Sequence, residues 1–212
     1  MERIVNNYTT TILGIALVIY CMVMVYRKIV PFFYKWEGGL SRDSKDSASS
    51  YPCPFLYKGH KDWHTNKGVT YRAWVSKFGE DNKARFFEMN SEDWGIIFKQ
   101  GYWDKVKGDQ IELQSIGEVL VSWAWGSGPR TAVKQIQRVV GVTRDGLIGP
   151  QTLGAINSCN EVELFDKCVE ARKGFFIYIA KRRPANARFL KGWLNRLNDF
   201  NKKFRPKEDE SK

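Results

Sequence analysis

Few residues in this chain could hold a metal ion. There are only two histidines and four cysteines among 212 residues. The histidines, His60 and His64, have no cysteine or further histidine at the spacing of a zinc site, and no two cysteines form a CxxC pair. We therefore expect neither a metal site nor a bound cofactor.

Internal repeats and low-complexity segments are also lacking, which excludes solenoid and array architectures. Strand patterns are scarce, whereas apolar residues at helical spacing recur along most of the chain. A mainly α fold follows, with Pro31 in a kink or a first turn, and Ser91 as an N-cap. The expected helices cover residues 25–36, 69–78, 91–102, 111–125, 131–140, 151–157, 162–182 and 185–204.

The positive charge is unevenly placed. The chain carries a net charge of +11, and residues 171–207 hold twelve Lys or Arg against one acid, Asp199. Such a surface attracts polyanions, including nucleic acid, anionic lipid and acidic cell-wall polymers, or it is simply a solvated helical face. No motif that recognises bases is present, so we expect no specific nucleic-acid partner.

Residues 8–26, YTTTILGIALVIYCMVMVY, form an uncharged apolar run close to the roughly 20 residues that span a bilayer. We expect an uncleaved signal anchor, one transmembrane helix ahead of the body. A cleavable signal is the first alternative, but Arg27 and Lys28 follow the run directly and no small-residue cleavage site does. The second alternative is a buried core helix.

Glu37 has the setting of an acid catalyst. It ends an aromatic-rich helix, beside Trp36 and before Gly38 and Gly39. The negative end of a helix dipole and an apolar neighbour both disfavour an ionised carboxylate. Glycoside cleavage needs one protonated carboxyl and a second group that activates water or stabilises the developing cation. The alternative is an ordinary solvated glutamate at a helix end.

The second group is expected in the polar loop over residues 40–66. Asp46 can fold back over the helix end and stay ionised in water, and Asp43 is its nearest rival. The hydroxyl of Thr65 could hold the attacking water.

Several of these residues resemble one known family in order. EGG at 37–39, Asp46, TN at 65–66 and GVT at 68–70 are similar to the EGG, D and TNxGIT pattern of glycoside hydrolase family 108, the phage-type N-acetylmuramidases. The resemblance continues through YWD at 102–104 and GSGP at 126–129. DGLIGPQT at 145–152 and FLKGWLNRL at 189–197 resemble that family's C-terminal predicted peptidoglycan-binding module.

The resemblance implies a lysozyme-like helical domain with a short loop or hairpin region after Glu37. It implies that Glu37 is the general acid, that Asp46 and Thr65 occupy the family's Asp and Thr positions, and that the enzyme cleaves β-1,4 bonds between N-acetylmuramic acid and N-acetylglucosamine. The expected segments are an anchor at 1–26, a catalytic domain at 27–125, a helical peptidoglycan-binding module at 126–205, and a disordered tail at 206–212.

The chain departs from the family pattern in two places. YPCPFLYKGHKDWH, residues 51–64, replaces a short Pro-Gly-Gly link, and its aromatic residues either line the cleft or cover it. Ser122 stands where an acidic residue is expected. We expect Trp63, Asn66 and Tyr102 to bind substrate, and DGLIGP to form a tight turn with glycine at positive φ.

The predicted enzyme is a membrane-tethered muramidase of a phage or prophage, with its catalytic domain on the cell-wall side of the bacterial inner membrane. The charges that flank residues 8–26 weakly favour the opposite orientation. Because no linker separates the anchor from the first helix, we expect release from the membrane to activate the enzyme. The alternative function is a non-catalytic, membrane-anchored wall-binding protein.

Overall fold

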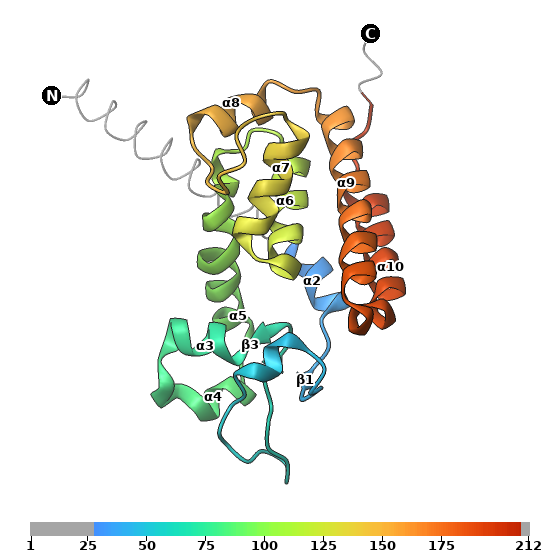
Figure 1. Cartoon of the computed structure of the whole chain (residues 1–212). Coiled ribbons are helices and arrows are strands. Elements are labelled where there is room, and N and C mark those ends of the chain that lie inside the picture. The colour runs from blue at the N-terminus through green and yellow to red at the C-terminus, as the bar shows by residue number, and fades with distance from the viewer. Residues whose placement is uncertain (1–27, 209–212) are drawn as a thin grey trace, which may run out of the picture.

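The computed structural model describes residues 28–208, and most of these are helical (Figure 1). The prediction of a mainly helical chain is confirmed, with a small sheet in the segment that follows Glu37. The predicted anchor at 8–26 and the end of the predicted tail, 209–212, lie outside the described residues. Along residues 28–208 we find no helix long and apolar enough to cross a bilayer.

Helix α2 (Val30–Trp36) carries the candidate acid at its end. Pro31 lies in the first turn, where its missing N–H costs no hydrogen bond. Phe32 and Phe33 are buried. Phe32 packs edge-on against Phe200, with ring centroids 5.5 Å apart. The helix is thus anchored on both sides, and the backbone becomes extended at Glu37.

The small antiparallel sheet consists of β1 (Leu40–Ser41), β2 (Thr65–Asn66) and β3 (Val69–Thr70), in that order. Lys67 and Gly68 join β2 to β3, and both have positive φ, as two-residue hairpin turns require. The turn is fixed to the helical part, because the Trp94 indole N–H donates to the Lys67 carbonyl (3.0 Å).

The remaining helices follow the predicted order, except that the short helix α4 was not predicted. Their bounds are α3 (Tyr71–Phe78), α4 (Lys83–Phe87), α5 (Ser91–Phe98), α6 (Gln114–Ser127), α7 (Pro129–Val139), α8 (Pro150–Asn157), α9 (Glu161–Arg182) and α10 (Ala187–Phe204). Two details correct the sequence-based expectation. Asn90, not Ser91, caps α5, in a reciprocal pair with Asp93. Val69 and Thr70 belong to β3, and the Thr70 hydroxyl caps α3.

Helix α6 is the centre of the helical part. Its residues from Ser115 to Ala124 are all buried, and it packs against α7 and α9. A helix buried on every side is expected at the core of a domain. The predicted domain boundary between residues 125 and 126 falls inside this helix, so the two predicted domains share one continuous element.

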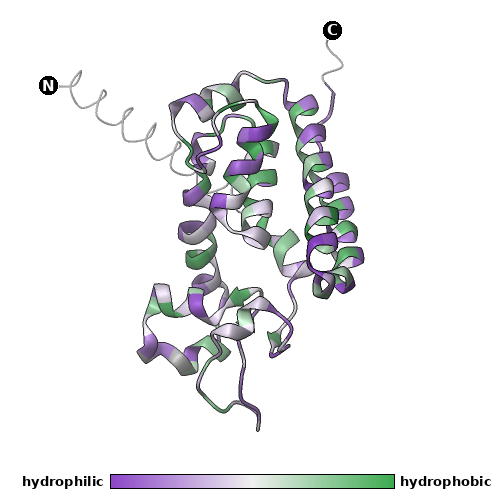
Figure 2. Cartoon of the chain, viewed as in Figure 1, coloured by the Kyte–Doolittle hydropathy of each residue, from purple (hydrophilic) through white to green (hydrophobic). Residues whose placement is uncertain are grey.

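Helices α9 and α10 lie antiparallel at one side of the molecule (Figure 1). Hydrophobic and hydrophilic residues alternate along both (Figure 2), as expected for helices with one face in the core. The segment before α8 forms the predicted tight turn, with Gly146 at φ +83°. The buried side chain of Gln137 holds this turn, accepting from Gly146 N (2.9 Å) and donating to Asp145 (2.7 Å).

Candidate active site

The carboxylate of Glu37 lies between two elements that are far away in sequence. Its Oε1 accepts from the Trp125 indole N–H (2.8 Å) and from Arg196 Nη1 (2.7 Å). The Glu37 side chain is 12% exposed and that of Arg196 is 21% exposed. Trp125 belongs to α6 and Arg196 to α10, so both helical layers position this carboxylate.

Trp125 is held in place by other aromatic rings. It packs against Phe33, Trp94, Phe98 and Tyr102, with centroid separations from 4.7 to 5.6 Å. A ring fixed on several sides cannot rotate freely, so its N–H stays directed at Glu37. The Glu37 carboxylate therefore has one hydrogen-bond donor, the Trp125 indole N–H, whose position is fixed by packing.

Gly68 is required beside this carboxylate for two reasons. Its φ is +77°, which L side chains rarely adopt. A Cβ at this position would also lie 2.3 Å from Glu37 Oε2. Any side chain here would displace the carboxylate.

The structure brings Glu37, Asp46 and Thr65 to one cleft of about 550 Å³. Asp46 is half-buried and its Oδ1 accepts from Ala48 N (2.9 Å), which fixes the carboxylate at the start of a 3-10 turn. The cleft is lined by Glu37, Asp46, Ser47, Ala48, Ser50, Tyr51, Thr65, Gly68, Thr70, Arg72, Trp125, Gly126, Trp193 and Arg196.

Asp43, the rival of Asp46, does not line this cleft. Its carboxylate accepts from Lys45 N (3.0 Å) and pairs with Arg188 of α10 (2.6 Å). The Lys45 backbone hydrogen bond, and then the Arg188 charge, hold the pKa of Asp43 below its usual value. Among these two aspartates, the geometry favours Asp46 as the second carboxylate.

The Thr65 hydroxyl has a hydrogen-bond partner, His64, next to it in the sequence. His64 is fully buried, with Nδ1 2.9 Å from Thr65 Oγ1 and Nε2 3.1 Å from the Asp43 carbonyl oxygen. A carbonyl only accepts, so Nε2 carries a proton, and in this tautomer Nδ1 is the acceptor. The Thr65 hydroxyl then donates to His64, which leaves its oxygen free to accept from a water molecule.

The predicted substrate-binding residues fall in three different places. Asn66 is buried, and its amide donates to the Phe86 carbonyl (2.7 Å), which is a structural contact. Trp63 donates to the carbonyls of Tyr57 and His60 (both 3.1 Å) and so holds the inserted segment 51–64 together. Neither residue lines the cleft that contains Glu37.

Tyr102 is close to the candidate acid. It lines a second cavity of about 500 Å³ that shares Trp125 and Gly126 with the first. Burial, followed by the charge of Glu37, raises the pKa of Tyr102. Of the three predicted substrate-binding residues, Tyr102 alone is placed beside the cleft.

The indole N–H of Trp36 donates to Asp199 on α10 (2.7 Å), and Lys35 pairs with the same carboxylate (2.8 Å). The side chains that donate to the Glu37 carboxylate are those of Trp125 and Arg196. The role of Glu37 as the acid stays a prediction.

Arg196 could not be predicted as a partner of Glu37, because it lies in the basic run of residues 171–207 and 159 positions after Glu37. Together with Arg188 and Asp199 it forms one face of α10, which contacts residues 35–43 at three points. No local signal distinguishes this arginine from its solvated neighbours.

Ser122 occupies the position where the family resemblance led us to expect an acidic residue. Its hydroxyl and carbonyl accept from Arg172 (2.9 and 2.8 Å). Arg172 is buried, and desolvation together with the nearby charge of Arg196 lowers its pKa to about 9. Ser122 therefore supplies two hydrogen-bond acceptors to a buried arginine that has no carboxylate partner among the described residues.

Two family models and a solved structure are similar to this chain. Residues 30–128 match the family model described as Glycosyl hydrolase 108, and residues 131–198 match the one described as Predicted Peptidoglycan domain. A solved structure of SagA from Brucella abortus is similar, with a TM-score of 0.69 and 26% sequence identity. The similarity covers 86% of this chain and 97% of that one. A search of curated proteins finds no match.

Proposed function

We propose that this chain, a peptidoglycan hydrolase similar to the glycosyl hydrolase 108 proteins, cleaves the β-1,4 bond between N-acetylmuramic acid and N-acetylglucosamine. The observation that carries the proposal is the cleft in which Glu37, Asp46 and Thr65 meet. A glycosidase needs this combination of a proton donor, a second carboxylate and a site for water.

Each residue has a defined task. Glu37 donates a proton to the glycosidic oxygen as the bond to the leaving sugar breaks. Asp46, fixed by Ala48 N, stabilises the positive charge that develops on the sugar ring. Thr65 accepts a hydrogen bond from the attacking water, and Asp46 takes the proton that this water releases as it adds to the sugar.

Arg196 Nη1 donates to Glu37 Oε1 at 2.7 Å, and the Trp125 indole N–H donates to the same oxygen at 2.8 Å. On this proposal, the two donors together hold the Glu37 side chain in position for the glycosidic oxygen.

The test is zymography with peptidoglycan in the gel, comparing the full chain with Glu37→Gln and a matched control, Glu88→Gln, whose side chain is exposed at the end of α4. Glu37→Gln should lose clearing and still bind isolated sacculi, and the control should clear normally. Mass analysis of the products then identifies the bond cut. Clearing by Glu37→Gln would assign catalysis to another residue.

We further propose that residues 8–26 tether the enzyme to the inner membrane on the cell-wall side, where a phage or prophage would use it for lysis. The support is the uncharged apolar run itself. Fractionation of cells expressing the full chain, or residues 27–212, tests the tether. The full chain should sediment with membranes, and equal activity of both forms on accessible wall would contradict activation by release.

A further inference from the structure

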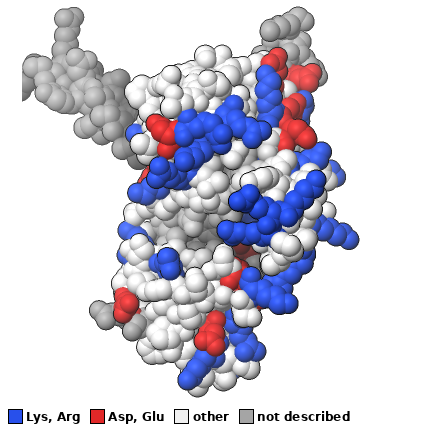
Figure 3. Space-filling model, viewed as in Figure 1, with Lys and Arg blue, Asp and Glu red and all other residues white. Residues whose placement is uncertain are grey.

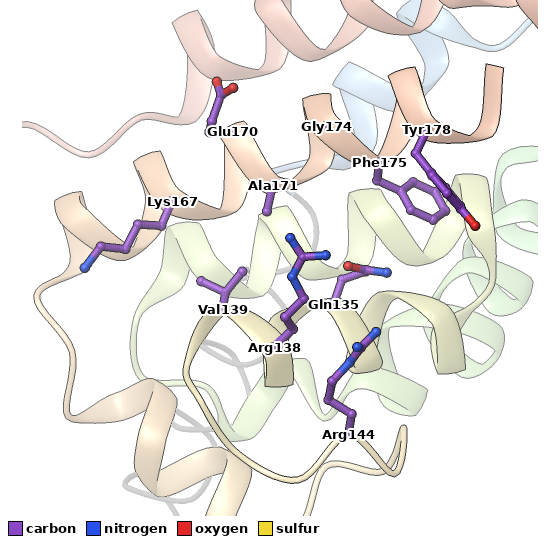
Figure 4. Close-up of a pocket in the computed structure, with 10 residues that line it drawn as sticks. All are labelled: Gln135, Arg138, Val139, Arg144, Lys167, Glu170, Ala171, Gly174, Phe175 and Tyr178. Carbon is purple, nitrogen blue, oxygen red and sulfur yellow. The ribbon is translucent and has the colours of Figure 1, made fainter. Parts of the chain in front are cut away.

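A second concave site lies in the C-terminal part, away from Glu37. It is a groove of about 800 Å³ between α7, the turn after α7, and α9 (Figure 4). We call it the α7–α9 groove. None of the residues that line it also lines the cleft of Glu37.

The groove gathers positive charge from three separate elements. Arg138 comes from the last turn of α7, Arg144 from the following turn, and Lys167 from α9. Figure 4 shows Arg138, Arg144 and Gln135 directed into the space between α7 and α9. On the same face of the whole molecule, Lys and Arg cluster over α7 and over one end of the α9–α10 pair (Figure 3).

The two arginines are available to a ligand. Within residues 28–208, neither Arg138 nor Arg144 has a carboxylate within salt-bridge distance; Arg144 Nε donates to the Lys134 carbonyl at 3.3 Å. Both side chains are exposed. An arginine fork without a partner matches the two oxygens of a carboxylate.

One end of the groove is aromatic. Phe175 is fixed against Trp123 of α6, with ring centroids 5.9 Å apart, and Tyr178 is 57% exposed beside it. Figure 4 shows both rings at the same end of the groove. A cation cluster beside an aromatic platform suits a ligand that carries both acidic groups and an apolar surface.

We propose that the α7–α9 groove binds the peptide stem of peptidoglycan through the stem's carboxylates. This inference rests on the proposed function for its substrate class, and it assigns a site that is separate from the catalytic cleft. The acidic groups of peptidoglycan lie on its peptide stems, whereas its N-acetylated sugars are neutral. The positive groove therefore complements the stem and not the glycan strand.

Glu170 also lines the groove, but its carboxylate is 3.4 Å from Lys173 and is directed away from Arg138 and Arg144 (Figure 4). The two arginines therefore face the groove without competition from this carboxylate and are open to the carboxylates of the stem.

The test is calorimetric binding of a free tetrapeptide stem that contains meso-diaminopimelate, with the full chain in detergent. This probe has no glycosidic bond, so the result does not depend on whether Glu37 is the acid. The test variant is Arg138→Gln/Arg144→Gln. The matched control is Lys191→Gln/Lys202→Gln, which removes the same charge from exposed positions on α10.

The stem should bind the unmodified chain and the control equally, and bind the test variant at least about tenfold more weakly. Tyr178→Ala should also weaken binding, and thermal unfolding should show that all variants are folded. Equal weakening by the control pair, or tighter binding of polyphosphate through the same arginines, would overturn the proposal.

Discussion

Arg196→Met tests the coupling between the C-terminal helices and the candidate acid. The substitution removes the guanidinium that donates to Glu37 Oε1 at 2.7 Å. Methionine keeps an unbranched apolar side chain against Phe32 and Phe33, whose ring centroids lie 5.7 and 5.2 Å from the guanidinium carbon. The effect of the charge is thereby separated from the loss of packing.

The expected loss of stability can be worked out from the geometry. At 2.7 Å and an effective dielectric of about 20, the Coulomb attraction is ~6 kcal/mol. Desolvation offsets much of this, and a hydrogen bond to a charged group contributes about 1.5–3 kcal/mol net. Removing Arg196 also relieves its repulsion of Arg172. We therefore expect a loss of about 2 kcal/mol in the free energy of unfolding, which is roughly 4–8 °C in Tm.

The assays are thermal unfolding and kcat/KM on soluble glycan strands. Arg196→Met removes one of the two donors to Glu37 Oε1 and leaves Trp125, so the carboxylate is less firmly positioned and kcat/KM should fall. Arg196→Lys keeps a donor and should retain more of the activity. If Arg196→Met leaves both Tm and kcat/KM unchanged, the ion pair has no role in positioning the acid.

Three further predictions concern single residues. Gly68→Ala should abolish clearing of peptidoglycan in zymograms, because the new Cβ would lie 2.3 Å from Glu37 Oε2. The positive φ at this position should also lower the free energy of unfolding of the variant by about 1–2 kcal/mol, as measured by chemical denaturation. Ser122→Ala should lower the free energy of unfolding by about 1–3 kcal/mol, because Arg172 Nη1 loses its acceptor. Burial raises the pKa of Glu118 to about 7. Because the folded protein binds this proton more tightly than the unfolded chain, protonation of Glu118 adds about 3 kcal/mol to the free energy of unfolding. This stabilisation is complete below pH ~4.5 and is lost as pH rises through about 7. Glu118→Gln should remove the pH dependence in denaturation curves, and a Tm that rises with pH in the unmodified chain over this window would contradict the assignment.

Local sequence signals predicted most of the fold. Apolar periodicity located the long helices, because burial of one helical face repeats every turn whatever the partner. It failed at short elements: α4 has only five residues, and Val69 and Thr70 form a strand because they pair with β2. Asn90 and not Ser91 caps α5, a choice between two good capping residues that only the backbone decides.

The candidate site was predicted in part for a similar reason. Glu37, Asp46 and Thr65 lie within thirty positions of each other, so an ordered motif could point to them. The partners of Glu37 and Thr65 could not be found this way. Arg196 is 159 positions from Glu37 and reaches it only because α10 packs beside α2, and His64 acts through a buried hydrogen bond. Neither tertiary contact leaves a local pattern.

The three contacts of α10 with residues 35–43 have a consequence for recombination between proteins of this kind. The two family matches meet near residue 130, which suggests a natural place to exchange a wall-binding module. A crossover there would leave Glu37 facing another protein's helix, without Arg196, and Asp43 without Arg188. Exchange at this point is therefore compatible with function only when α10 is inherited together with α2 and the loop that follows it.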